Sequence, residues 1–173
     1  MRTTGGQAVQ VIVIMGVSAA GKTTVGRALA HELGWPFHDA DDYHSAHNIA
    51  KMRAGEPLND ADRRPWLAAL RRLIDDIIEH GDHGILACSA LKQSYRDALT
   101  PRGIQGSRVR FVFLDVPEPI LEERIARRRG SFAPPELLPS QLATLEKPHD
   151  AVCVDGARPV SEIVKSIRAA LSI

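Results

Sequence analysis

The segment 16–24, GVSAAGKTT, completes the pattern G-x-x-x-x-G-K-[ST]. An apolar run at 9–15 precedes it, and a helical pattern begins near Lys22. A buried strand, a glycine-bounded turn and a helix N-terminus direct backbone N–H groups towards one point, where the helix dipole favours an anion. Lys22 can then reach the β- and γ-phosphates of a nucleoside triphosphate, and the Thr23 hydroxyl can bind Mg²⁺. The segment therefore predicts a triphosphate-binding loop rather than a glycine-rich turn with an incidental lysine. Its residues are Gly16, Val17, Ser18, Ala19, Ala20, Gly21, Lys22, Thr23 and Thr24.

Two acidic residues, Asp39 and Asp41, follow a short strand predicted at 36–39. In an open α/β sheet, ligands bind beyond the carboxyl ends of the strands, so we expect both carboxylates on the γ-phosphate side of the loop. Phosphoryl transfer to an alcohol needs Mg²⁺ held by a carboxylate, and a group that orients or deprotonates the hydroxyl. The two residues point the same way from an extended segment and could divide these tasks. A solvated turn is the structural alternative.

A polar segment at 48–67, NIAKMRAGEPLNDADRRPWL, concentrates basic, amide and carboxylate groups between two apolar elements. Such a segment suits a polyhydroxylated, anionic substrate. A helical hairpin on the surface, with charges that only solvate it, would have the same composition. The composition leaves both interpretations open.

Four arginines between positions 124 and 129 precede the segment GSFAPP at 130–135. A cationic insertion punctuated by glycine and proline suits a small lid, over about 124–140, that excludes water and stabilises the transferring charge. The cluster is too small for a nucleic-acid-binding patch, and glutamates at 118, 122 and 123 offset it.

Strand-like runs alternate with helical patterns along the whole chain. The predicted strands are 9–15, 36–39, 84–88, 108–114 and 151–154, and the predicted helices are 22–33, 60 or 62 to 80, 118–128 and 159–171. We expect Asp60 or Asp62 to cap the long second helix, which carries an apolar stripe. Strand–helix alternation predicts a parallel sheet with right-handed crossovers. The expected fold is a single α/β domain over 1–173, with a five-stranded parallel sheet between two helical layers.

The composition is that of an ordinary globular protein of 173 residues, with 44% hydrophobic residues, 25% charged residues and a formal charge of +1. This balance argues against nucleic acid or an anionic membrane as a partner. No apolar run approaches the length of a membrane span, and residues 1–7, expected to be a disordered lead-in, lack a signal-peptide pattern. Cys88 and Cys153 lie in apolar runs and are expected to be reduced core thiols. We expect a cytoplasmic protein.

Several longer motifs are more specific than the phosphate-binding loop. They are D-x-D-D-x-H at 39–44, N-x-x-K-M-x-x-G-x-P-L-N-D-x-D-R-x-P-W-L at 48–67, C-S-A-L-K-x-x-Y-R-D at 88–97 and S-Q-x-x-T-L-E at 140–146. Together with the loop, they resemble gluconokinases, small P-loop kinases related in fold to shikimate and nucleoside monophosphate kinases. The resemblance implies ATP- and Mg²⁺-dependent phosphorylation of D-gluconate at its 6-hydroxyl to 6-phospho-D-gluconate. It also implies a homodimer.

The same resemblance implies roles for individual residues. The implied metal ligands are Thr23 and Asp39, and the implied catalytic residues are Lys22, Asp41 and Arg128. The implied lid arginines on ATP are Arg124 and Arg128. The implied gluconate-binding residues are Asp41, His44, Lys51, Arg63, Lys92 and Arg96, of which Arg63, Lys92 and Arg96 are candidates for its carboxylate. The roles of Asp39 and Asp41 could be exchanged, and Arg63 could instead pair with Asp60 or Asp42.

Some residues depart from the gluconokinase pattern. Ala19 and Ala20 replace a glycine and a small residue, Ala40 stands where glycine is common, and Ser131 stands where histidine is common. An alanine at a position that requires a positive φ would be strained.

Two further sites and two further functions are alternatives. The run FVFLD at 111–115 resembles a Walker B strand, which makes Asp115 a second candidate for the metal. The histidines at 44, 47 and 149 lack the spacing of a zinc site. A kinase for shikimate or another hydroxy acid is the alternative enzyme. A nucleotide-dependent switch is the non-enzymatic alternative, although neither N-K-x-D nor D-x-x-G occurs.

Overall fold

Five parallel strands form the centre of the molecule in the order β2-β3-β1-β4-β5. The computed structural model describes residues 8–128 and 134–173. The strands are β1 Val11–Met15, β2 Phe37–Asp39, β3 Gly84–Ala87, β4 Val109–Asp115 and β5 Val152–Asp155. These bounds differ by one or two residues from those predicted, and the parallel five-stranded sheet is confirmed.

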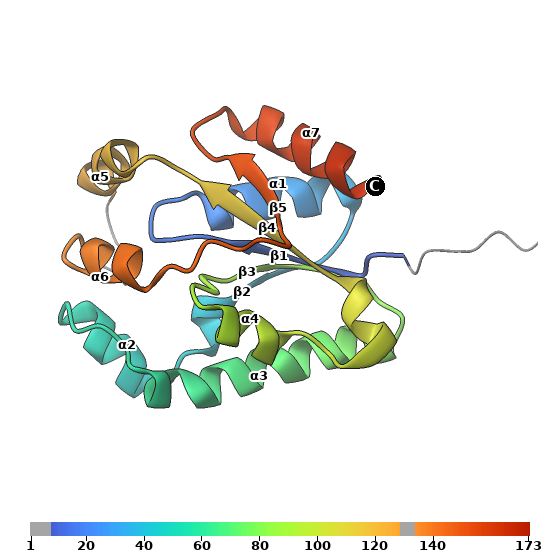
Figure 1. Ribbon diagram of the computed structural model, residues 1–173, viewed down its shortest axis with the longest axis horizontal. Helices are drawn as coiled ribbons and strands as arrows, with labels where there is room; N and C mark the ends of the chain where they lie inside the picture. The colour runs from blue at the N-terminus through green and yellow to red at the C-terminus, as the bar shows by residue number, and fades with distance from the viewer. Residues whose placement is uncertain (1–7, 129–133) are drawn as a thin grey trace, which may run out of the picture.

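Helices cover both faces of this sheet (Figure 1). The α-helices are α1 Lys22–Leu33, α2 Ala46–Arg53, α3 Asp60–Glu79, α4 Gln93–Leu99, α5 Glu118–Arg127, α6 Leu137–Thr144 and α7 Val160–Leu171. Two 3₁₀ helices, η1 Ala40–Tyr43 and η2 Gly103–Arg108, complete the described elements. The structure therefore confirms the three-layer α/β/α arrangement, and it adds α2, α4 and α6 to the predicted helices.

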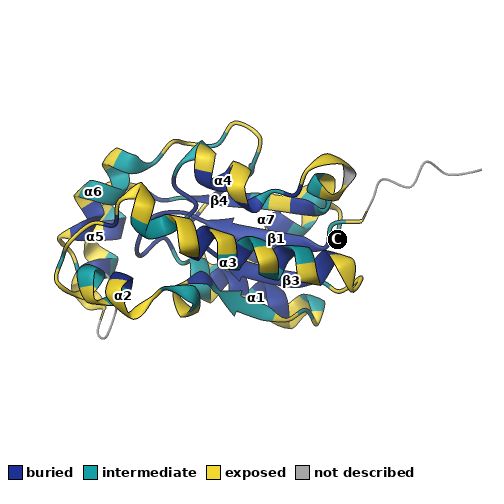
Figure 2. Ribbon diagram, turned by 90° about the horizontal axis from the view of Figure 1, so that it is seen from below, coloured by how far each residue is buried: buried dark blue, intermediate teal, exposed yellow. Residues whose placement is uncertain are grey.

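Successive side chains of β1 point to opposite faces of the sheet, and this alternation explains the three layers. All five of its residues are fully buried, as expected for a parallel strand that is covered on both faces. Ile12 and Ile14 join the apolar cluster formed with α1, α5 and α7, whereas Val11, Val13 and Met15 join the cluster formed with α3 and α4. In Figure 2, buried residues lie on the inner sides of the helices, towards the sheet.

The long helix α3 begins with a capping box. The Asn59 side chain accepts a hydrogen bond from the Asp62 N–H (2.8 Å), and the Asp62 carboxylate accepts one from the Asn59 N–H (3.0 Å). The predicted cap at Asp60 or Asp62 was therefore wrong, since Asn59 is the N-cap and Asp62 completes the box from inside the helix. The segment 48–67 forms the end of α2, a connecting loop and the start of α3.

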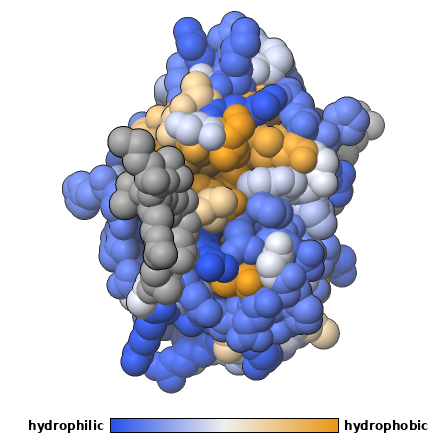
Figure 3. All heavy atoms as spheres, turned by 90° about the vertical axis from the view of Figure 1, so that its right-hand side faces the viewer, coloured by the Kyte–Doolittle hydropathy of each residue, from blue (hydrophilic) through white to orange (hydrophobic). Residues whose placement is uncertain are grey.

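The two ends of the sheet differ in their surroundings. At the carboxyl ends of the strands, α2, α5 and α6 gather around the loops that follow the strands (Figure 1). At the amino ends, the surface carries an apolar patch surrounded by hydrophilic side chains (Figure 3). The loops that carry the predicted chemistry all lie at the carboxyl end.

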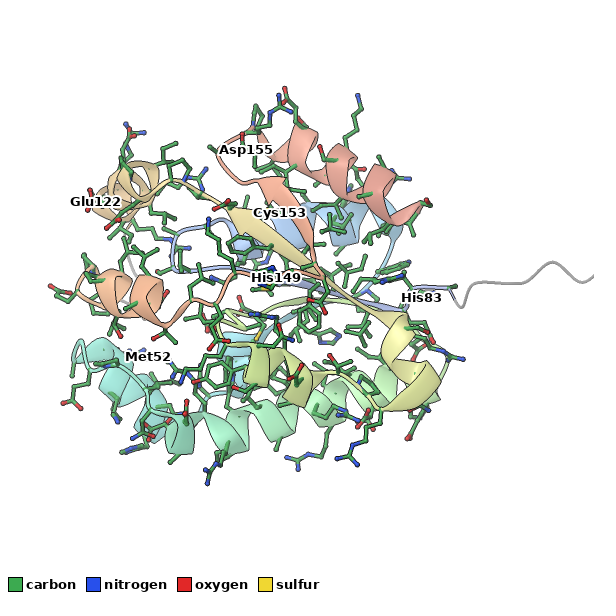
Figure 4. All side chains as sticks on the ribbon, viewed as in Figure 1. Met52, His83, Glu122, His149, Cys153 and Asp155 are labelled. Atoms are coloured by element: carbon green, nitrogen blue, oxygen red, sulfur yellow. The ribbon has the colours of Figure 1, made fainter. Side chains whose placement is uncertain are left out.

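The two cysteines differ in exposure. Cys88 is buried as predicted, but Cys153 is exposed, so its prediction as a core thiol was wrong. Cys153 lies on β5 (Figure 4), an edge strand that pairs only with β4, and its side chain faces solvent. Among residues 8–128 and 134–173, no helix combines the length and apolar character that a membrane span requires.

Candidate active site

The phosphate-binding loop connects β1 to α1 and depends on unusual backbone geometry. Gly16 and Gly21 have φ of 152° and 99°, and Ala19 has φ of 64°. Glycine adopts these angles without strain, whereas the Cβ of Ala19 makes its left-handed conformation costly. The strain expected at Ala19 is therefore present in the loop.

Lys22 folds back across this loop. Its Nζ donates to the Val17 carbonyl oxygen at 2.9 Å. Burial lowers the pKa of Lys22, and the nearby Asp41 carboxylate opposes this shift. Within the described residues, Lys22 forms no direct ion pair with a carboxylate, so its ammonium group is available for a phosphate.

Asp39 and Thr23 place two oxygen ligands together. The Thr23 Oγ1 donates to Asp39 Oδ2 at 3.1 Å, and Asp39 Oδ1 accepts from the Asp41 N–H at 3.0 Å. The second bond makes Asp39 the N-cap of η1 and holds its carboxylate in place. Hydroxyl and carboxylate oxygens suit Mg²⁺, which keeps several waters and binds phosphates besides one or two protein ligands. The described residues contain no cluster of three or more His, Cys, Asp or Glu side chains for a metal.

The main cavity opens between this loop, the ends of β2 and β3, and helices α2, α3 and α6. Its polar and charged lining side chains are Ser18, Lys22, Thr23, Asp39, Asp41, His44, Arg63, Ser89, Arg128, Ser140 and Gln141. Apolar side chains from α2, α3, α6 and the loop between α2 and α3 complete the wall, including Met52 (labelled in Figure 4), Leu58, Trp66 and Leu137. The cavity thus brings together the loop lysine, both predicted carboxylates and three of the predicted cationic or imidazole side chains.

Asp41 faces this cavity. Its side chain is 55% exposed, yet withdrawal from bulk solvent raises the pKa of Asp41, while the Lys22 ammonium lowers it. A carboxylate with a raised pKa accepts a proton more readily than an ordinary aspartate does. Asp41 is therefore suited to take a proton from an acceptor hydroxyl.

His44 lies beside Asp41 and is held by three contacts. Its ring stacks on Trp66 at 4.3 Å between centroids, its Nδ1 lies 3.4 Å from Asn48 Nδ2, and its Nε2 lies 4.0 Å from Asp41 Oδ1. Burial, and secondarily the charge of Arg63, lowers the pKa of His44 to about 4. The imidazole is therefore neutral at neutral pH. Because Asn48 Nδ2 can only donate, Nδ1 is the acceptor and Nε2–H is directed towards Asp41.

Arg63 lies farther along the same cavity. Its Nη1 donates to the Leu58 carbonyl oxygen (2.6 Å) and to the Tyr95 hydroxyl (3.1 Å), and its guanidinium lies 5.3 Å from the centre of the Tyr95 ring. In the described chain, Arg63 forms no ion pair with Asp60 or Asp42, so the predicted structural alternative is wrong. Tyr95 and Lys92 instead hydrogen-bond Asp60.

Lys51, Lys92 and Arg96 do not line the cavity. Lys51 pairs with Asp62 at 2.7 Å, and Lys92 pairs with Asp60 at 3.1 Å. The roles of Lys51 and Lys92 as substrate ligands stay predictions, because neither side chain lines the cavity in this structure.

The predicted role of Arg96 conflicts with its burial. Arg96 is 2% exposed, and its guanidinium donates to the carbonyl oxygens of Ala90, Leu91 and Glu146. Burial also lowers the pKa of Arg96. The structure contradicts the prediction that this side chain binds gluconate, because its donors fasten the loop after β3 to the chain that follows α6.

A second cavity lies on the other side of the phosphate-binding loop. Its lining includes Ala20, Gly21, Thr24, Arg124, Arg127, Arg128, Gly156 and Arg158. Arg124 donates to the carbonyl oxygens of Ala19 and Ala20 (3.2 Å each) and of Gly156 (2.8 Å). Arg128 lines both cavities, so it lies where a triphosphate would pass from one to the other.

Asp115, the alternative metal ligand, lines neither cavity. Its carboxylate lies 3.3 Å from Lys147 Nζ. The structure therefore favours Asp39 over Asp115 for the metal. Residues 129–133, including Arg129 and Ser131, lie outside the described residues.

The sequence prediction missed several lining residues. Ser140 and Gln141 lay in a motif that the resemblance singled out, and Ser89 lay in another. Met52, Leu58 and Trp66 carried no chemical signal, because an apolar side chain in a cavity wall has the same sequence pattern as one in the core.

Comparisons with known proteins show the family of this chain. A family model described as an AAA domain matches residues 11–148. A gluconokinase of Gluconobacter oxydans (strain 621H) is 47% identical over 80% of this chain and 76% of its own length. A probable gluconokinase of Dictyostelium discoideum is 41% identical over 91% of this chain and 84% of its own length. This chain belongs to the gluconokinase family.

Three solved kinase structures resemble the structure of this chain. A gluconokinase from Sinorhizobium meliloti 1021 superposes with a TM-score of 0.79 at 44% identity, over 94% of this chain and 91% of that one. A sugar kinase from Janibacter sp. HTCC2649 reaches a TM-score of 0.86 at 40% identity, over 95% of each chain. A shikimate kinase from Aquifex aeolicus, at 22% identity and a TM-score of 0.63, shares the fold.

Proposed function

We propose that this protein transfers the γ-phosphoryl group of ATP to the 6-hydroxyl of D-gluconate, and so supplies 6-phospho-D-gluconate to sugar-acid catabolism and the pentose phosphate pathway. The observation that carries the proposal is the order of groups along the main cavity. The Asp41 carboxylate is close enough to Lys22 to oppose the lowering of the Lys22 pKa, and His44 Nε2 lies 4.0 Å from Asp41 Oδ1. The charge of Arg63 in turn lowers the pKa of His44. An acceptor with a hydroxyl at one end and a carboxylate at the other matches this order.

In the proposed reaction, the loop N–H groups and Lys22 hold the phosphates. Mg²⁺, held by Thr23 and Asp39, would neutralise charge on the β- and γ-phosphates. Asp41 takes the proton of the 6-hydroxyl as that oxygen bonds to the γ-phosphorus. The bond from the γ-phosphorus to the bridging oxygen breaks, and ADP leaves.

Binding of the carboxylate falls to Arg63 in this proposal. A guanidinium matches a carboxylate with two parallel N–H donors, and only Nη1 of Arg63 is used by described protein atoms. Apolar wall residues such as Trp66 would face the C–H groups of the acceptor.

The remaining expectations are part of the same proposal. We infer one kinase domain over residues 1–173 from the length and the strand–helix alternation, and a lid near 124–140 from its arginines, glycine and prolines. A cytoplasmic location follows from the composition and the N-terminal sequence, and a homodimer from the gluconokinase resemblance. Sedimentation velocity would test the dimer directly.

A substrate panel tests the proposed function. ADP release is measured with D-gluconate, shikimate and nucleoside monophosphates at fixed ATP and Mg²⁺. We expect turnover with gluconate alone. Turnover with shikimate and not with gluconate would overturn the proposal, as would ATP binding without any acceptor-dependent turnover.

Asp41→Asn tests the proposed base. Removing a general base costs about 100- to 10,000-fold in kcat, whereas ATP binding should be retained. The matched control is Asp42→Asn, because Asp42 is exposed and lies outside the cavity lining. Unchanged turnover in Asp41→Asn would remove Asp41 from its role.

A further inference from the structure

Gln141 makes a long-range contact with the phosphate-binding loop. Its side-chain Oε1 accepts a hydrogen bond from the Ser18 N–H at 2.6 Å, across 123 positions of the sequence. Ser18 is 7% exposed, and both residues line the main cavity. A side chain from α6 therefore occupies one amide of the phosphate-binding loop in the main cavity.

The end of α6 is fastened in place. The Glu146 N–H donates to the Leu91 carbonyl oxygen (2.8 Å), the Glu146 carboxylate accepts from the Gln93 N–H (2.9 Å), and Arg96 donates to the Glu146 carbonyl oxygen (2.9 Å). Leu138, one turn before Gln141, packs in the cluster that contains Ala19. These contacts hold α6 in place and so fix the position of the backbone from which the Gln141 side chain extends.

The bond to Ser18 leaves the other half of the Gln141 amide free. The carboxamide carries one acceptor oxygen and two N–H donors in one plane. With Oε1 on the Ser18 N–H, the Nε2 group lies beside it at the cavity, and it has no acceptor among the described residues. The cavity thus contains a neutral donor of two N–H groups that no protein group within residues 8–128 and 134–173 satisfies.

The position of this donor points to the acceptor rather than to the nucleoside. Ser18 and Gln141 line the cavity that contains Asp41 and Arg63 as well as Lys22, whereas neither lines the second cavity, which contains Thr24 and Arg124. The phosphates already have the other loop amides, Lys22 and Arg128. A further donor in the cavity that contains Asp41 and Arg63 is matched by the hydroxyl oxygens of a polyol.

We propose that Gln141 is a substrate-contacting residue, whose Nε2 donates to a hydroxyl oxygen of gluconate next to the reacting one and so favours transfer to gluconate over transfer to water. The inference rests on the proposed function. In transfer to water, a water oxygen bonds to the γ-phosphorus, its proton passes to Asp41, and the products are ADP and inorganic phosphate. An acceptor bound by Gln141 excludes that water.

The test is Gln141→Met, which has a similar length and no amide, measured together with Gln141→Ala. Loss of one neutral hydrogen bond to a substrate costs about 2- to 10-fold in kcat/KM for gluconate. We expect that loss, a Kd for ATP within about threefold of the original, and more inorganic phosphate released per 6-phosphogluconate formed. Gln105→Met is the matched control, because Gln105 is exposed on η2.

Three results would overturn the inference. An unchanged kcat/KM and an unchanged phosphate ratio in both folded variants would mean that Gln141 has only a structural role. Tighter ATP binding would mean that Gln141 competes with the nucleotide for the Ser18 N–H. Weaker ATP binding with an unchanged phosphate ratio would place it on the phosphates. Thermal unfolding checks that the variants fold, and failure of the original protein to phosphorylate gluconate would count against the proposed function instead.

Discussion

The Thr23 hydroxyl and the Asp39 carboxylate meet at 3.1 Å, although they follow strands that are not neighbours. Thr23 lies in the first turn of α1 after β1, and Asp39 ends β2, with β3 between the two strands. The crossover through α1 thus brings the end of β2 next to the phosphate-binding loop. The contact therefore joins the loop that would hold ATP to the segment that carries Asp41, the proposed base for the acceptor hydroxyl.

Asp39→Asn should weaken the response to Mg²⁺. The amide keeps the shape of the side chain but removes the charge that supports the cation. We expect the Mg²⁺ concentration for half-maximal turnover to rise about 10- to 100-fold, measured by titration at saturating ATP and gluconate. Asp115→Asn is the control, since Asp115 pairs with Lys147 instead. A larger effect in Asp115→Asn would restore the Walker B interpretation.

Arg63→Met should impair gluconate binding selectively. The long apolar side chain keeps the packing on Tyr95 but loses the charged donors. Charge-assisted hydrogen bonds contribute about 1.5–3 kcal/mol, so KM for gluconate should rise about 10- to 100-fold with KM for ATP little changed. Steady-state kinetics with each substrate varied will show this. The adjacent, exposed Arg64 provides the control Arg64→Met, and equal effects of the two variants would contradict the assignment.

Ala19→Gly should have a small effect on nucleotide binding. Ala19 has φ of 64° and is 4% exposed. Glycine relieves about 1–2 kcal/mol of backbone strain in the folded chain. Its greater conformational freedom in the unfolded chain costs about 0.5–1 kcal/mol of folding stability. Because the strained loop is already formed, we expect ATP affinity to change by less than about tenfold in a nucleotide titration.

Ala20→Gly is the matched control for that substitution. Ala20 is not among the residues with positive φ, so its replacement relieves no strain and should only destabilise the fold. A gain of more than about tenfold in ATP affinity for Ala19→Gly would mean that the alanine limits formation of the binding conformation.

His44 should make stability depend on pH. The pKa of His44 is about 4 in the fold against an ordinary 6.5. Between these values the unfolded state binds more protons than the native state, so the free energy of unfolding falls as the pH falls through the window. The slope can approach about 1.4 kcal/mol per pH unit. His44→Phe keeps the stacking on Trp66 and should remove this part of the slope.

Urea unfolding at pH 7 and at pH 4.5 measures the effect of His44→Phe. The control is His47→Phe, because the His47 side chain is 72% exposed and should leave the slope unchanged. An identical pH dependence in His44→Phe and the original protein would show that His44 titrates at its ordinary pKa in the fold.

Local signals predicted the phosphate-binding loop and the strands around it. Gly16, Gly21 and Lys22 act through the backbone geometry of one strand–turn–helix unit, which a short stretch of sequence specifies. Asp39 and Asp41 were also predictable, because residues at the carboxyl ends of parallel strands gather at one edge. The role of Arg128 on the phosphates, by contrast, came only from the resemblance to related kinases and stays a prediction.

Burial was the property that sequence patterns predicted least well. Arg96 has the charge expected of a carboxylate ligand, but Glu146, 50 positions away, helps to enclose it. Cys153 lies in an apolar run, but β5 is an edge strand that leaves it exposed. Both errors have one cause: the exposure of a side chain depends on which elements pack over it.

The sequence by itself determined the chemistry, since the loop, the two aspartates and the longer motifs specify a kinase of the gluconokinase family through local geometry and residue type. The tertiary structure decided which of six predicted substrate residues face the cavity, and it placed Gln141 on the Ser18 N–H across 123 positions. A contact between distant segments depends on packing of the whole sheet and its helices, and no local pattern encodes that distance.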